Sequence, residues 1–199
     1  MRRKGEKHPT RPLEDNEYYK ILELLQDGFK YTVDGKEKVF RPNYQIAIIL
    51  FLEANVGLRV GDILSLKLSN FRGKTLSIVE DKTDKLMDRE IEDGVINIIM
   101  RYAIDNGIKK DQKLFNITTR AVQKQLKIVC DYLGLDHIST HSFRKMYATN
   151  QYQKNNNDIY LVKDLLNHAS IATTQKYIML NKEKVNKASK SYNIGGIKY

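Results

Sequence analysis

Cysteine is nearly absent from this sequence, which has one, Cys130, among 199 residues. A single cysteine cannot form an internal disulfide, so this scarcity predicts an intracellular protein in a reducing compartment. Long apolar runs are lacking too. The longest strongly apolar run covers residues 46–52, which is too short to span a bilayer, and the basic start has no apolar stretch behind it. Neither a membrane-spanning protein nor a disulfide-stapled secreted domain is expected.

Metal-ligand spacing is also missing. The four histidines and one cysteine form no cluster of the kind that holds a metal, so neither a metal nor another cofactor is expected. There is no internal repeat and no low-complexity tract. Hydrophobic residues make up 41% of the chain, which predicts a folded protein, and the length favours one domain.

Positive charge is what the sequence has in excess. Lysine and arginine number 34 against 24 acidic residues, a formal net charge of +10, which favours a nucleic acid or an anionic membrane surface as partner. Residues 1–12 and residues 181–199 each carry five basic residues and one acidic residue, so residues 13–180 hold only +2. These ends are either solvated tails or arms that contact phosphates. Because no basic amphipathic helix with aromatic anchors is found, nucleic acid is the favoured partner.

The spacing of apolar residues predicts a mostly helical α+β domain with a small antiparallel sheet near its middle. Asp34-Gly35 predicts a hairpin turn, and Asp158 and Ser170 are expected to cap helices, the second of which carries Tyr177. The expected helices include 14–26, 44–54, one from about 60, 96–106 and 119–133, and the expected strands are 75–79 and 89–91 with a turn between them.

Two short patterns carry reactive residues. His141 and Arg144 lie three residues apart, so on a helix both face the same side, where a phosphate could accept hydrogen bonds from them. His168 precedes Tyr177 by nine residues. Taken alone, His141 is expected to be a structural or surface residue, and Tyr177 a packed helix aromatic.

The other motifs in the sequence change that interpretation. Four motifs follow one another along the chain: GLRVGDILSLKLSNF, VEDKTDK, STHSFRKMYAT and LLNHASIATTQKYI. Together they resemble the boxes of the tyrosine recombinases, also called the phage integrase family, over roughly residues 13–180. The resemblance implies the fold of that family's catalytic domain for 13–180, with a basic arm at 1–12 and a basic tail at 181–199 that could pack on a neighbouring protomer. It also implies site-specific cleavage and rejoining of DNA through a 3′-phosphotyrosine.

The resemblance assigns roles residue by residue. It implies a nucleophile, an acid–base histidine, three phosphate ligands, a lysine that protonates the leaving oxygen, and a supporting acid. In that order these are Tyr177, His141, Arg59 with Arg144 and His168, Lys82, and Asp62. Lys85 lies in the same expected turn and is the alternative to Lys82. The sequence departs from the family pattern at Thr140, Lys145 and Asn167, of which Asn167 replaces a glycine and still tolerates a left-handed backbone.

The implied partners are double-stranded DNA and further copies of the chain, as a homotetramer on synapsed DNA and a monomer in free solution. No membrane partner is implied, and the expected location is the cytoplasm, on DNA. A type IB topoisomerase and a non-catalytic DNA-binding relative stay open as alternatives. Only about a dozen residues precede the first expected helix, so the chain is either an excised catalytic domain or a natural short recombinase.

Deleting residues 1–12 and 181–199 should weaken DNA binding and flatten its salt dependence, because these ends hold most of the net charge. The logarithm of the binding constant falls by about 0.9 per contacted phosphate for each tenfold rise in salt, so titrations at several salt concentrations measure the loss. A full-length variant with glutamine at the basic positions of both ends is the control for length. An unchanged salt slope in the trimmed chain would contradict this division of charge.

Overall fold

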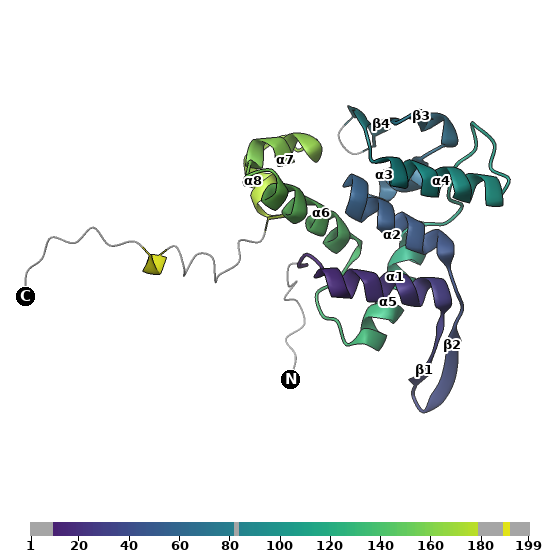
Figure 1. Ribbon diagram of the computed structural model, residues 1–199. Helices are drawn as coiled ribbons and strands as arrows, with labels where there is room; N and C mark the ends of the chain where they lie inside the picture. Colours follow the sequence, from purple (N-terminus) through teal and green to yellow (C-terminus); the bar gives the residue numbers. More distant parts are fainter. Residues whose placement is uncertain (1–9, 82–83, 179–188, 192–199) are drawn as a thin grey trace, which may run out of the picture.

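The computed structural model describes residues 10–81, 84–178 and 189–191. It confirms a mostly helical α+β fold with small antiparallel sheets (Figure 1). Within the described residues, no helix is both long and apolar enough to cross a membrane. The elements in chain order are α1 (Asp15–Asp27), β1 (Phe29–Val33), β2 (Lys36–Phe40), α2 (Tyr44–Val56), α3 (Val60–Ser65), η1 (Leu68–Asn70), β3 (Phe71–Arg72), β4 (Thr75–Glu80), β5 (Lys85–Glu90), α4 (Asp93–Asp105), α5 (Thr119–Leu133), α6 (Thr140–Lys154), α7 (Ile159–Leu165) and α8 (Ile171–Gln175).

The hairpin of β1 and β2 extends away from the helices (Figure 1). Val33 pairs with Lys36, so the loop consists of Asp34 and Gly35 alone. Both residues have positive φ angles, 52° and 71°, which is the backbone of the two-residue turn that suits twisted antiparallel strands. The hairpin expected from Asp34-Gly35 is thus confirmed.

Helix α2 lies at the centre of the molecule, where it packs against α1, α3, α4 and α6. Its residues are apolar on nearly every side, and Ile46, Ile49 and Leu52 are completely buried. Asn43 caps its start by accepting a hydrogen bond from the backbone N–H of Ile46 at 3.1 Å. The central buried helix that the sequence predicted is therefore confirmed.

Gly57 ends α2 and turns the chain toward Arg59. Its φ angle is 75°, in the left-handed region where a side chain is strained. A Cβ atom at this position would also lie 2.5 Å from the ring of Tyr147 on α6. Glycine is therefore required here twice over, by the turn and by the close approach of α6.

The three-stranded sheet has the order β3–β4–β5 and is antiparallel throughout. The expected returning strand, 89–91, was too short and began too late. Strand β5 starts at Lys85, which pairs with Glu80 of β4, because the pairing continues along the full length of β4. Lys85, expected in the turn, is thus the first residue of a strand.

Helix α6 joins two hydrophobic clusters. Phe143 and Met146 belong to the large core that includes α2, whereas Tyr147 and Ala148 belong to a small cluster with residues of α7 and Ile178. In Figure 1, α6 runs from the main body to the pair formed by α7 and α8. Helix α6 therefore links the main core to the segment that follows it, α7 and α8.

Truncating Ile99 to alanine should lower the free energy of unfolding by about 2–5 kcal/mol, because the side chain is 0% exposed and its loss leaves a cavity. Ile104 lies on the same helix, α4, and is 79% exposed, so Ile104→Ala is the matched control with a change of about 0.5 kcal/mol or less. Urea unfolding measures both. Equal losses in the two variants would be inconsistent with this packing of α4.

Candidate active site

Arg59 lies where α3 begins, immediately after the turn at Gly57. Its Nη1 atom forms an ion pair with Glu80 at 2.8 Å and lies 3.8 Å from Asp62. Both carboxylates are buried. The guanidinium of Arg59 is therefore held in place by two acidic side chains, one from the sheet and one from its own helix.

Asp62 also connects α3 to the turn after β4. Its Oδ1 atom accepts a hydrogen bond from the backbone N–H of Asp81 at 3.1 Å. Burial raises the pKa of this carboxyl group. Asp62 thus lies behind Arg59 and ties it to the β4–β5 turn, which is a supporting position.

Arg144 is completely buried on α6. Its Nη1 atom donates to the carbonyl oxygen of Gly57, and its Nη2 atom donates to that of Leu166 at 2.8 Å. Nη2 also lies 3.4 Å from Nε2 of His168. Burial lowers the pKa of the guanidinium, although an arginine in a protein keeps its proton. The family resemblance implies that Arg144 binds a phosphate. In the structure, its guanidinium already donates hydrogen bonds to two backbone carbonyl oxygens.

His141 and Arg144 differ in their exposure to solvent, although both lie on α6. His141 lies in the first turn, is exposed, and lines a cleft, whereas Arg144 lies beneath the surface. Ser139 starts the helix through a capping box with Ser142. The cap therefore holds His141 at the mouth of the cleft.

His168 follows a left-handed residue. Asn167 has a φ angle of 51°, which confirms the expectation that asparagine can replace glycine there. His168 is 4% exposed, and its Nδ1 atom lies 3.0 Å from Oγ1 of Thr174. Burial, together with the nearby cations of Arg144, Arg59 and Lys85, lowers the pKa of His168 to about 4. The imidazole is therefore neutral near pH 7.

Tyr177 lies just past the end of α8, not on the helix as expected. Helix α8 ends at Gln175, and Ile178 belongs to the small hydrophobic cluster. The tyrosine ring is half-buried. Its centroid lies 4.9 Å from that of His168 and 6.0 Å from Cζ of Arg144.

One open cleft of about 460 Å³ brings most of these side chains together. The predicted residues that line it are Arg59, Asp62, His141, His168 and Tyr177. The predicted lysine, Lys82, lies outside the residues that the structure describes. Lys85, the alternative, is exposed, and its Nζ atom lies 3.4 Å from the carbonyl oxygen of Asn167.

Sequence reasoning missed two side chains beside the cleft, Glu80 and Thr174. The burial of β4 alternates, with Leu76, Ile78 and Glu80 on the inner side, so the two-residue period of a strand could have placed Glu80 inside. Thr174 had no such signal, because α8 has only five residues. Thr119 and Gln123 of α5 also line the cleft.

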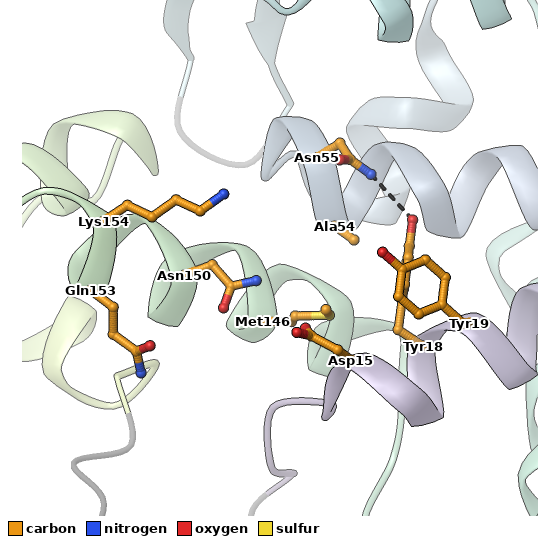
Figure 2. Close-up of a pocket in the computed structure, with 9 residues that line it drawn as sticks. All are labelled: Asp15, Tyr18, Tyr19, Ala54, Asn55, Met146, Asn150, Gln153 and Lys154. Atoms are coloured by element: carbon orange, nitrogen blue, oxygen red, sulfur yellow. Dashed lines mark hydrogen bonds between the residues drawn. The ribbon is translucent and has the colours of Figure 1, made fainter. Parts of the chain in front are cut away.

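A second cleft, of about 500 Å³, lies between α1, α2 and α6 and contains none of the predicted residues. Figure 2 shows Tyr18 and Tyr19 on one side of it and Asn150 and Lys154 on the other. Asn55 donates a hydrogen bond to the hydroxyl of Tyr18 at 3.3 Å. This second cleft is slightly larger than the first, but it is not the predicted site. Neither Tyr177 nor any of the predicted arginines and histidines lines it. Among the described residues no group of histidine, cysteine, aspartate or glutamate could hold a metal ion.

Comparison with known proteins shows the family and the fold of this chain. Residues 11–184 match the phage integrase family. A probable integrase/recombinase of Acholeplasma phage L2 is 29% identical over 196 residues, which cover 94% of this chain and 65% of that protein. The probable integrase/recombinase YoeC of Bacillus subtilis is 28% identical over 88% of this chain and 95% of its own length. The chain thus spans less than two thirds of the phage relative.

Solved structures share the fold. The XerH site-specific recombinase bound to palindromic difH substrate, a post-cleavage complex, superposes with a TM-score of 0.69 at 21% identity, covering 94% of this chain and 54% of that one. A lambda integrase tetramer bound to a Holliday junction gives 0.68 at 15% identity, with coverages of 100% and 54%. Since the family match covers most of the residues, this chain belongs to the phage integrase family.

Proposed function

We propose that this protein is a site-specific DNA recombinase that cleaves and rejoins strands through a 3′-phosphotyrosine. The observation that carries the proposal is the convergence of Arg59, His141, His168 and Tyr177 on one cleft, with Arg144 directly beneath. These residues come from three of the four sequence motifs. Residues 13–180 form the catalytic unit in this proposal, and residues 1–12 and 181–199 are its basic arms.

The chemistry follows from the residue types. The phenolic oxygen of Tyr177 attacks phosphorus, the bond from phosphorus to the 5′-oxygen breaks, and the tyrosine becomes esterified. His141 lies at the mouth of the cleft and accepts the phenolic proton. A lysine from the β4–β5 turn returns a proton to the departing 5′-oxygen. The reverse reaction rejoins the strand, so the phosphotyrosine conserves the bond and no nucleotide is needed.

Charge stabilisation is divided unequally between the two arginines. Arg59 lines the cleft and uses Nη1 for Glu80, so the other N–H groups of its guanidinium are the ones that reach the phosphate. Arg144 is buried with two carbonyls, and its positive charge acts on the phosphate from below. His168, which is neutral, adds a hydrogen-bond donor from its ring. Asp62 supports Arg59 without reacting.

The partners are double-stranded DNA and, on synapsed DNA, three further copies of the chain. Support comes from the lambda integrase tetramer on a Holliday junction, which shares this fold, and from the net charge of +10. The free protein is a monomer in this proposal, and it acts on DNA in the cytoplasm.

Replacing Tyr177 with phenylalanine should abolish the covalent protein–DNA adduct, because phenylalanine has no oxygen to attack phosphorus. Nicked suicide duplexes from a random-sequence pool let the protein select its own site, and a denaturing gel detects the adduct. Tyr160→Phe is the matched control, since Tyr160 is 66% exposed on α7 and is absent from the cleft. A wild-type chain that binds DNA but forms no adduct on any duplex would refute the proposal. Recombination between two sites, as opposed to plain relaxation, then separates a recombinase from a topoisomerase.

Removing the general acid should slow cleavage by about 10²- to 10⁴-fold. We expect this for Lys82→Ala and not for Lys85→Ala. Replacing the bridging 5′-oxygen by sulfur makes the leaving group a thiolate, which departs without a proton, so the true acid variant regains its rate on that substrate. Adduct formation on the two substrates measures the difference. Recovery in Lys85→Ala instead would assign the proton transfer to Lys85, whose ammonium lies beside Asn167.

A further inference from the structure

One buried residue, Thr174, contacts both His168 and the segment that carries Tyr177. Thr174 on α8 is completely buried, and its Oγ1 atom lies 3.0 Å from Nδ1 of His168. Its carbonyl oxygen accepts a hydrogen bond from the backbone N–H of Tyr177 at 2.9 Å. The same residue therefore sets both the imidazole ring and the start of the segment that carries the proposed nucleophile.

The position of the ring proton in the free protein follows from the neighbours of His168. A guanidinium can only donate hydrogen bonds, so Nη2 of Arg144, 3.4 Å away, faces a bare Nε2. The ring is neutral, because it is buried among Arg144, Arg59 and Lys85 and has a pKa of about 4. Its one proton is consequently on Nδ1, which donates to the hydroxyl of Thr174.

A phosphate in the cleft reverses this requirement. Its oxygens accept hydrogen bonds, so Nε2 must carry the proton in order to donate to them. Nδ1 then becomes an acceptor and needs a donor of its own. One proton leaves Nδ1 and one arrives at Nε2 by exchange with water, so the charge of the ring is unchanged. A threonine hydroxyl suits both states, because it has one O–H donor and two lone pairs and can rotate between them.

We infer that Thr174 is a positioning residue whose hydroxyl lets His168 move its ring proton from Nδ1 to Nε2 when a phosphate binds. The inference rests on the proposed function, since the switch needs a phosphate in the cleft. Valine at this position has the same shape but can neither accept nor donate a hydrogen bond. It therefore leaves Nδ1 without a partner whether or not that nitrogen carries the proton. Serine keeps the hydroxyl and supports both.

The first test reads the ring nitrogens of ¹⁵N-labelled histidine by NMR, with His168→Gln used to assign the signals. Wild type and Thr174→Ser should show the proton on Nδ1 in the free protein and on Nε2 with saturating inorganic phosphate, whose binding is followed at the Arg59 side chain. Thr174→Val should keep the proton on Nδ1 even at saturating phosphate, because Arg144 still faces Nε2 in the free protein and valine offers Nδ1 no donor after the proton has moved. Ala172→Val is the control for the His168 signal, because Ala172 is exposed on the same helix and does not line the cleft.

Two NMR outcomes would overturn the inference. One is a Thr174→Val protein whose His168 signals match those of wild type with and without phosphate. The other is a wild-type ring that keeps its proton on Nδ1 at saturating phosphate. Backbone spectra establish that each variant is folded, and Thr174→Ser provides the conservative rescue.

The second test measures adduct formation on the nicked duplexes. Thr174→Val should lower the rate by roughly 10- to 100-fold, the range found for outer partners of metal-binding histidines, while Thr174→Ser stays within about threefold of wild type. DNA affinity should stay within about twofold, since Thr174 is buried and contacts no solvent. If wild type forms no adduct, the proposed function fails, and the spectra recorded with inorganic phosphate still judge Thr174. If wild type and Thr174→Val react equally fast, only the inference about Thr174 fails.

Discussion

The buried guanidinium of Arg144 is the interaction on which the rest of the site depends. A buried charge without partners costs several kcal/mol, and here the carbonyl oxygens of Gly57 and Leu166 provide them. Gly57 ends α2 and Leu166 ends α7, so one side chain on α6 joins the ends of two other helices. Arg59 follows the first of these carbonyls by two residues and His168 follows the second by two. The position of each is thus set by the same cation.

Arg59 is held by acidic side chains before any ligand enters. Glu80 and Asp62 face its guanidinium. Glu53 is completely buried nearby, and burial raises its pKa well above the usual value. In the proposed reaction, a phosphodiester would meet an arginine that is already oriented, and such a preorganised cation stabilises the negative charge that develops on phosphorus.

Local patterns predicted much of this structure correctly. The apolar run of α2, the turn at Asp34-Gly35 and the caps at Asp158 and Ser170 depend on neighbouring residues, so the sequence reveals them. Errors arose where contacts between segments decide. The start of β5 is set by its pairing with β4, and Ile178, one residue after Tyr177, packs against residues of α6 and α7. The apolar spacing within a single segment shows neither of these contacts.

The sequence by itself determined the family, the central buried helix and the residue types proposed for the reaction, because motif order and apolar spacing are properties of the chain alone. Only the tertiary structure decided which of these residues are buried, which are exposed and which side chains they contact. It buried Arg144 beneath the cleft while His141 stayed exposed, although both lie on one helix. It also placed Glu80 against Arg59 and Thr174 against His168. Those contacts depend on which segments pack together, and packing is a property of the whole fold.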